Sequence, residues 1–394
     1  MLDPLHARAL YLEQAERRAL LFSCDLLALS REFVTRLRSI IQAELDVPEG
    51  AILLACTHTH SAPATLFLWE CGELETGYLA WLETRLVELA RAAIASRQPV
   101  KASAGKAHLP DISENRRVEG GPIDPGVNVL CLEKPDGEKL AVLFNFACHP
   151  TCLQYPNRLV SGDYPGCAMR LVQEATGATA MFFNAAAGNI RPVQRNSVEA
   201  LQATGARLAG VVLKVLQGLS PVEPLELFFA RQEFAAPFLR LPTRAELEQV
   251  DFHSDRPLFY VPQRSALMDK KQARVIEGWR ASNLAALRQG SLPETMLAEV
   301  QVIRLGNLAL VGIPGELFVE LGLEIKHRAG LEHILISCYT NDDLGYIPAR
   351  HSYAHGGYEV EESYILHNLP SVLAPQVGEH LVEAALGLIQ QAPI

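Results

Sequence analysis

The stretch ILLACTHTHS at residues 52–61 joins a run of five apolar residues to two histidines. Such a short, continuous apolar run is typical of a strand that is buried on both faces. The stretch LAVLFNFACHPT at residues 140–151 repeats this arrangement around a third histidine, His149. Because ligands in open α/β sheets bind beyond the carboxyl ends of strands, the two stretches predict a site at one edge of a sheet.

Strand-like and helix-like segments alternate along the rest of the chain. The patterns predict further strands at 18–29, 179–183, 308–313 and 333–338. They predict helices at 32–44, 77–96, 164–175, 198–216, 316–328 and 371–390. This alternation favours an α/β fold, in which helices flank a mixed β-sheet core and a metal site lies at the strand ends.

We expect one domain over residues 1–394, because no internal repeat, low-complexity tract or linker divides the chain. Residues 234–290 are expected to form an excursion that shapes the substrate pocket. The first part of this segment, 234–262, is rich in proline, and a long helix is expected after it at 266–288.

The composition excludes several classes of partner. The net charge is −10 and no block of Lys or Arg stands out, so nucleic acid is not expected as a partner. No apolar run reaches the length of about 18 residues that a transmembrane segment needs.

The N-terminal sequence MLDPLHARAL shows no signal-peptide pattern, and five of the eight cysteines lie in or beside apolar strand-like runs. A reducing, cytoplasmic location is therefore expected.

The histidines are the first candidates for chemistry. On an extended chain, His58 and His60 point to the same side, which suits a divalent metal or one ligand beside one proton-transfer group. The alternative is a pair of partly buried histidines that backbone carbonyls satisfy, and the motif alone favours it. His149 precedes a proline, which ends the strand and holds His149 in an extended conformation. It is therefore a ligand candidate, with a structural role as the alternative.

Three further residues have weaker signals. Glu316 follows a Pro-Gly pair and is expected to open a helix, where it either complements the helix dipole or serves as a carboxylate ligand. The strand expected at 333–338 is followed at residues 339–346 by a cluster of acidic and amide residues, which ends in Tyr346. Tyrosines usually pack, so the sequence alone favours packing for Tyr346 and Tyr358.

Taken in order, six motifs resemble the amidase domain of the neutral, non-lysosomal ceramidase family. They are LLACTHTHSAP, NFACHPT, SGDYPGCAM, FFNAAAGNI, IPGELFVELG and LGYIPARHSY with GGYEVEES. The resemblance runs from residue 3 to about residue 363. It implies a zinc amidohydrolase that cleaves the N-acyl bond between a fatty acid and an amine.

The resemblance also implies roles for individual residues. It places zinc ligands at His58, His149, Glu316 and Tyr346. It places other site residues at His60, Tyr358 and Arg116. His60 is then the group that protonates the departing amine, and Tyr358, His60 or the metal stabilises the oxyanion.

The chain departs from the family pattern at Arg191. The family has a serine there, within Gly-Asp-Val-Ser-Pro, whereas this chain reads Gly188-Asn189-Ile190-Arg191-Pro192. A guanidinium is always charged and is no nucleophile, so hydrolysis is expected to use a metal-activated water. Arg191 beside Arg116 predicts an anionic group on the substrate. The alternative is that Arg191 turns outward and pairs with Glu199.

Together these features predict a zinc-dependent hydrolase of acyl amides, with a small-molecule or lipid-like acyl substrate other than ceramide itself. Two alternatives stay open: an esterase or lactonase on the same zinc site, and a non-catalytic metal-binding homologue. No β-sandwich is expected after the catalytic body.

Overall fold

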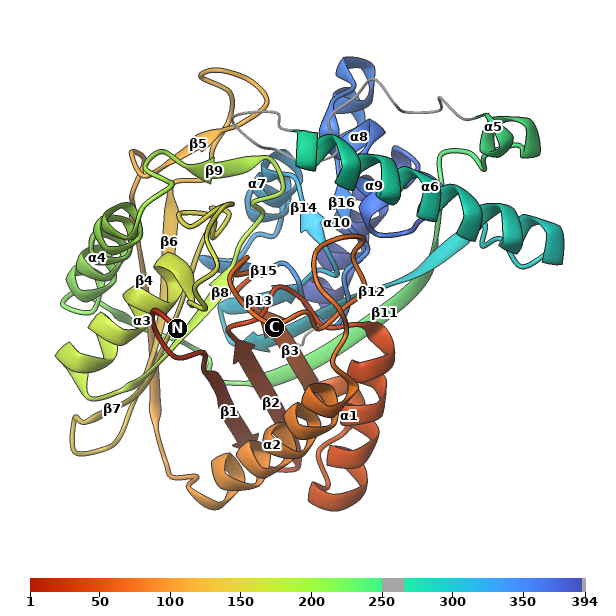
Figure 1. Ribbon diagram of the computed structural model, residues 1–394. Helices are drawn as coiled ribbons and strands as arrows, with labels where there is room; N and C mark the ends of the chain where they lie inside the picture. Colours follow the sequence, from red (N-terminus) through yellow and green to blue (C-terminus); the bar gives the residue numbers. More distant parts are fainter. Residues whose placement is uncertain (250–265, 392–394) are drawn as a thin grey trace.

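Two β-sheet layers stacked face to face form the centre of the fold, as the computed structural model shows for residues 1–249 and 266–391 (Figure 1). One layer is a five-stranded sheet. Its order is β10 (Ser220–Pro221), β4 (Lys101–His108), β6 (Gly126–Glu133), β7 (Lys139–Phe146) and β8 (Thr179–Asn184).

The facing layer consists of two smaller sheets. The first has the order β1 (Ala7–Gln14), β2 (Arg17–Cys24) and β3 (Ile52–Cys56). The second has the order β11 (Leu227–Pro237), β12 (Thr295–Leu305), β13 (Leu308–Gly312) and β15 (His333–Ser337). An isolated bridge between Ala55 and Thr340 joins them. Parallel pairs, such as β7 with β8 and β13 with β15, occur beside antiparallel ones, so the expected mixed sheet is confirmed.

An apolar core fills the space between the two layers. Alternate residues of each strand point into it, as the twofold period of an extended chain requires. Examples from the three sheets are Leu21, Leu53, Leu130, Leu143, Ile303 and Leu335. Strand β1 contributes Leu10 and Leu12 to this core.

Helices cover the outer side of each layer. Helices α3 (Asp163–Thr176) and α4 (Val198–Val215) share a core with the five-stranded sheet. Helices α1 (Arg31–Leu45), α2 (Thr76–Ala95) and α10 (Gln376–Gln391) share another with the two smaller sheets, and α7 (Val319–Arg328) contributes to both cores. The result is a four-layer arrangement of helices, sheet, sheet and helices, which confirms the expected α/β class. No helix among the described residues combines the length and the apolar character that crossing a lipid bilayer requires.

Several short strands and helices complete the fold. The paired strands are β5 (Ser113–Asn115) with β9 (Ile190–Pro192), and β14 (Glu316–Leu317) with β16 (Tyr346–Ile347). The short helices are η1 (Glu49–Ala51), α5 (Arg244–Glu248), η2 (Arg350–His355), α8 (Tyr358–Glu361) and α9 (Ser363–Leu366).

Three element boundaries differ clearly from the sequence prediction. The terminal helix expected at 371–390 begins only at Gln376. The helix expected at 316–328 begins at Val319, because Glu316 and Leu317 instead form the parallel ladder with β16. The strand expected at 18–29 ends at Cys24, where the buried Asp25 accepts a hydrogen bond from the backbone N–H of His6 and the chain turns.

The long helix expected at 266–288 is α6 (Ala266–Gln289), while residues 250–265 lie outside the described ones. Helix α6 packs against α9, where Val275 and Ile276 meet Ile365 and Leu366.

Candidate metal centre and its cavity

Four strand ends meet at one cavity of about 390 Å³. His58 follows β3, His149 follows β7, Glu316 lies just beyond β13, and Tyr346 follows β15. The site residues thus come from both sheet layers, which explains why they are far apart in the sequence and adjacent in space.

His58 is buried, and its backbone differs from the sequence expectation. Its φ angle is 69°, in the left-handed region, so the chain is not extended there. Residues other than glycine rarely adopt this conformation, and strained positions cluster at functional sites. The ring stacks on Tyr339 at a centroid distance of 3.7 Å, and Nδ1 lies 2.9 Å from the carbonyl oxygen of Leu27.

His149 is held in the same way. Its Nδ1 lies 2.7 Å from the carbonyl oxygen of Ala187, and its backbone N–H donates to the carbonyl oxygen of Ile190. A carbonyl oxygen only accepts, so Nδ1 bears the hydrogen in both histidines and Nε2 presents a lone pair. Burial lowers the pKa of His58 well below its usual value and that of His149 to about 3, so both rings are neutral at neutral pH.

Glu316 faces these two lone pairs. Its Oε2 lies 3.0 Å from Nε2 of His149 and 3.6 Å from Nε2 of His58. The backbone of Gly188 passes so close that a Cβ there would lie 2.3 Å from the carbonyl oxygen of Glu316, so only glycine fits at this position. None of the three facing atoms has a hydrogen-bond partner among the described residues.

Three buried acceptors that face one another need a cation or a proton between them. Burial raises the pKa of Glu316 to about 7, although Arg116, His367 and a hydrogen bond with Tyr346 lower it. A proton held by Glu316 satisfies the acceptors in part. A divalent metal would satisfy all three, and two imidazole nitrogens with a carboxylate oxygen form a donor set that zinc binds.

His60 completes the histidine cluster. The ring nitrogens of His58, His60 and His149 that face one another all lie within 4.8 Å. Unlike the other two, His60 is exposed, and its ring lines the cavity. Desolvation, followed by His149 and Arg116, lowers its pKa. A neutral, accessible imidazole beside the acceptor cluster is able to take up and return a proton.

Arg116 contacts Tyr346, and Tyr346 in turn contacts Tyr358. Its Nη2 donates to Tyr346 Oη at 2.9 Å and to the carbonyl oxygen of Gly188 at 2.8 Å, and its Nε donates to Glu359 at 2.8 Å. The rings of Tyr346 and Tyr358 meet edge to face at a centroid distance of 5.8 Å. Burial raises the pKa of both phenols, so each keeps its proton at neutral pH.

Arg191 is not where the sequence analysis placed it. It lies on β9, whose register sets it opposite Glu114 on β5, and its Nε donates to Glu114 Oε1 at 2.8 Å. Arg195 contacts the same carboxylate oxygen at 3.2 Å. Arg191 does not line the cavity, so it is neither the expected cation beside the metal site nor the partner of Glu199.

Two further residues line the cavity, and the sequence analysis pointed to only one of them. Asp343 belongs to the expected cluster at 339–346; burial raises its pKa to about 6, and its Oδ1 accepts a hydrogen bond from the N–H of Gly345. His367 also lines the cavity, but sequence reasoning missed it. It follows α9 instead of a buried strand, so the pattern that revealed the other histidines does not apply to it.

Comparison with known proteins tests the resemblance. No family model matches the chain. The neutral ceramidase of Pseudomonas aeruginosa is 26% identical over 431 aligned positions, which cover 90% of this chain and 63% of that protein. Its crystal structure aligns with a TM-score of 0.71 and 20% identity, over 98% of this chain and 69% of that one. A ceramidase complexed with C2 aligns with a TM-score of 0.72 and 20% identity, over 98% of this chain and 70% of that one.

These matches confirm the resemblance to the neutral ceramidase family. The chain spans just under two thirds of the length of the curated neutral ceramidase. The likeness to the two ceramidase structures extends over nearly the whole chain, so it includes both sheet layers and all the strand ends that form the cavity.

The segment expected to shape the pocket, 234–290, includes residues 250–265, which lie outside the described ones. The described side chains of residues 234–249 and 269–290 do not line this cavity. Helix α6 instead supports two loops that do. Arg274 pairs with Glu70 at 2.6 Å, and Trp279 Nε1 donates to the carbonyl oxygen of Leu369 at 2.6 Å.

Proposed function

We propose that this chain is a zinc-dependent amide hydrolase of the ceramidase type. The supporting observation is the convergence of three buried, unpartnered acceptors, His58 Nε2, His149 Nε2 and Glu316 Oε2, at the wall of a cavity. A structural role for two buried histidines would leave their lone pairs paired with donors, whereas here both face a carboxylate.

The donor set suits zinc, with Tyr346 as the fourth candidate ligand. Tyr346 lies directly beside Glu316 in the parallel pair of β14 with β16. Bound zinc supplies Lewis-acid chemistry, in which a carbonyl is polarised and the pKa of water falls toward about 7. The hydrogen bonds from Nδ1 to Leu27 and Ala187 fix the orientation of both imidazoles toward the metal.

The remaining site residues would handle protons and charge. Tyr358 keeps its proton and would donate a hydrogen bond to the oxygen that becomes negative when the amide carbon is attacked. His60 is neutral and would accept the proton of the attacking water, then pass it to the departing amine. Arg116 is held by Glu359 and Gly188, so it acts on Tyr346 as a positioning residue.

The cavity walls indicate the substrate class. Leu66, Leu68 and Leu153 line the walls, and such side chains suit an acyl chain. Arg191 lies outside the cavity, so it gives no reason to expect an anionic group on the substrate. We therefore propose a lipid-like acyl amide. We also propose a reducing compartment, because all eight cysteines are free and six of them are buried.

A turnover screen with zinc-loaded and chelator-treated protein tests this function. The substrates are matched dodecanoyl amides, dodecanoyl esters and lactones. We expect amide hydrolysis that chelation abolishes and zinc restores. The variant His58→Ala should be inactive, and His327→Ala, which removes an exposed histidine of α7, should be fully active. Ester or lactone hydrolysis alone would favour an esterase, and zinc binding without any turnover would favour a metal-binding homologue.

A further inference from the structure

The backbone of Tyr339 is hydrogen-bonded beside two of the candidate metal ligands. Tyr339 lies two residues after the end of β15. Its carbonyl oxygen accepts a hydrogen bond from the N–H of Cys56 at 3.1 Å, and its own N–H donates to the carbonyl oxygen of Gly315 at 3.3 Å. Cys56 lies two positions before His58. Gly315 directly precedes Glu316. Tyr339 therefore links the strand ends that carry these two ligands.

The side chain of Tyr339 contacts His58 directly. The phenol and imidazole rings are nearly parallel, with an interplanar angle of 13° and a centroid distance of 3.7 Å. His60 and His149 meet the His58 ring edge to face, at 86° and 80°. Tyr339 is buried and is not among the residues that line the cavity. It therefore acts on the site through His58 and does not touch the substrate.

The orientation of the His58 ring depends on two contacts. The hydrogen bond between Nδ1 and the carbonyl oxygen of Leu27 fixes one edge of the ring, but a single hydrogen bond lets the ring tilt about it. The stack with Tyr339 blocks this tilt on one face. The left-handed backbone of His58 adds to the need for support, because strained conformations persist only where the surroundings over-determine them.

The stack should be stronger when a metal is bound. The imidazole loses electron density when Nε2 binds a metal, and so it becomes more cationic. A cationic group over the face of an aromatic ring, within about 6 Å of its centroid, is attracted by that ring. The phenol ring of Tyr339 lies well within this distance. The contact therefore favours the metal-bound site over the empty one, which is a contribution to metal affinity.

The hydroxyl group of Tyr339 takes no part in this support. Its Oη is buried and has no hydrogen-bond partner among the described residues. A buried hydroxyl without a partner loses its hydration and gains nothing in return. The aromatic ring is thus the part of the side chain that serves the site, and phenylalanine would keep it.

We propose that Tyr339 is a positioning residue, whose ring holds the His58 imidazole in the orientation that binds the metal. This inference rests on the metal of the proposed function, but it does not depend on the hydrolysis.

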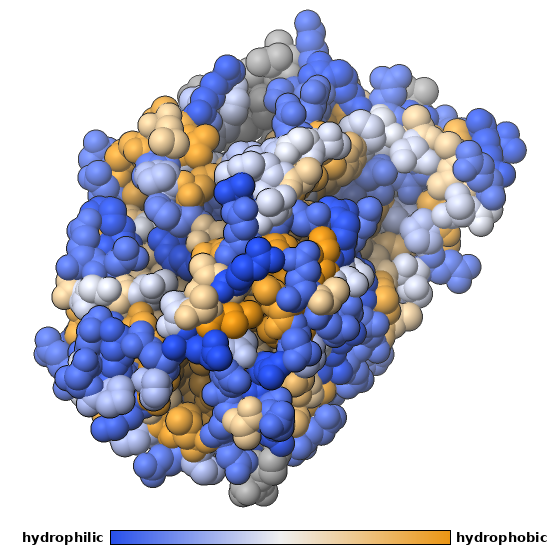
Figure 2. Space-filling view, turned by 90° about the horizontal axis from the view of Figure 1, so that it is seen from below, coloured by the Kyte–Doolittle hydropathy of each residue, from blue (hydrophilic) through white to orange (hydrophobic). Residues whose placement is uncertain are grey.

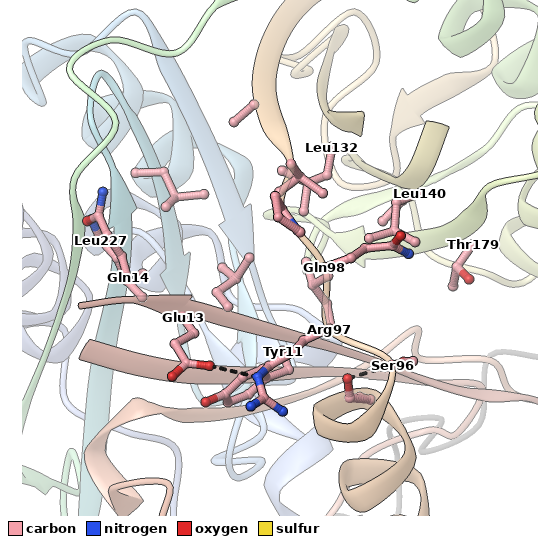
Figure 3. Close-up of a pocket in the computed structure, with 18 of the residues that line it drawn as sticks. Tyr11, Glu13, Gln14, Ser96, Arg97, Gln98, Leu132, Leu140, Thr179 and Leu227 are labelled. Carbon is pink, nitrogen blue, oxygen red and sulfur yellow. Dashed lines mark hydrogen bonds and ion pairs between the residues drawn. The ribbon is translucent and has the colours of Figure 1, made fainter. Parts of the chain in front are cut away.

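The larger cavity of the molecule offers no competing metal site. It has a volume of about 640 Å³ and lies at the opposite end of the two sheet layers, where hydrophobic residues gather in the middle of the surface (Figure 2, Figure 3). The described residues that line it include no histidine or cysteine. Their one carboxylate, Glu13, pairs with Arg97 at 3.2 Å. Zinc titration should therefore report on the histidine site, which is the one cluster of three such ligands found among the described residues.

Zinc titration of metal-free wild type, Tyr339→Leu and Tyr339→Phe tests the proposal, with a chromophoric chelator as competitor at neutral pH. We expect Tyr339→Leu to weaken zinc binding roughly tenfold, as loss of an outer-shell partner does, and Tyr339→Phe to stay within about twofold of wild type. The visible absorption bands of the Co²⁺-loaded protein depend on the coordination geometry. They should change in Tyr339→Leu and stay the same in Tyr339→Phe.

A matched control separates positioning from general loss of packing. Phe182→Leu also removes a buried ring, which packs against Phe144 and does not line the cavity. We expect it to lower the melting temperature and to leave zinc affinity unchanged. Tyr339→Met provides a second variant if Tyr339→Leu does not fold, because the unbranched methionine side chain fills irregular space. The same loss of zinc affinity is expected for it.

Three results would overturn the proposal: a folded leucine or methionine variant that binds zinc like wild type, a phenylalanine variant that loses as much affinity as leucine, or an equal loss in Phe182→Leu. Wild type that binds no zinc would refute this inference together with the proposed metal centre. Zinc binding without turnover would refute only the proposed hydrolysis, because every readout here is metal binding.

Discussion

The substitution Glu316→Gln tests the candidate metal centre most directly, because it should affect metal binding and the stability of the metal-free protein in opposite ways. The Glu316 carboxylate faces two imidazole lone pairs, and its pKa rises from 4.5 to about 7. The folded metal-free protein therefore binds a proton that the unfolded chain has lost at the same pH. Stability that is present below pH 4.5 is lost as the pH rises through 7.

The size of this effect follows from the pKa shift. At 1.36 kcal/mol for each pKa unit, ionised Glu316 costs the metal-free protein roughly 3 kcal/mol at pH 8. Glutamine has no charge to bury, and its amide N–H is able to donate to Nε2 of His149. We therefore expect the metal-free variant to melt roughly 4 °C higher than the metal-free wild type at pH 8, and at almost the same temperature at pH 4.

Metal binding should change in the other direction. Loss of outer-shell partners alone costs about 10- to 100-fold in metal affinity, so loss of the carboxylate ligand should cost at least 100-fold. Chelator-treated protein is measured by differential scanning fluorimetry at both pH values and by zinc titration at pH 8. Glu320→Gln is the matched control, because Glu320 lies four residues further along and accepts from Asn189 instead. A variant with unchanged zinc affinity, or one less stable than metal-free wild type at pH 8, would refute the reasoning.

Further substitutions test the other site residues. His58→Ala and His149→Ala should each release the zinc that elemental analysis finds in wild type and in His327→Ala; full zinc in either histidine variant would contradict the ligand assignment. Arg191→Ala should leave KM for anionic and neutral acyl amides within about twofold, because Arg191 pairs with Glu114 outside the cavity; a selective rise in KM for anionic substrates would restore its anion-binding role. Ser61→Ala, Ser113→Ala and Ser161→Ala should each keep hydrolysis; loss of activity in a variant that melts like wild type would indicate a serine nucleophile.

The strand ends of the site were visible in the sequence for a physical reason. Strands buried on both faces, such as β3 and β7, are continuous apolar runs, and a polar residue directly after such a run stands out. His58 and His149 were found in this way. Glu316 was found too, although the sequence predicted a helix there. The parallel pairing with Tyr346 that makes it a strand joins residues 30 positions apart, which no local pattern records.

Strand β4 and Arg191 show what local sequence patterns do not record. β4 contains the small and charged residues KASAGKAH, so its apolar pattern is too weak to reveal a strand. Arg191 was assigned to the metal site because a motif placed it next to the cavity residues along the chain. Its true surroundings depend on the register of β5 against β9, which turns Arg191 toward Glu114. A register is set by contacts between distant segments, and a shift of one residue would reverse the side chain.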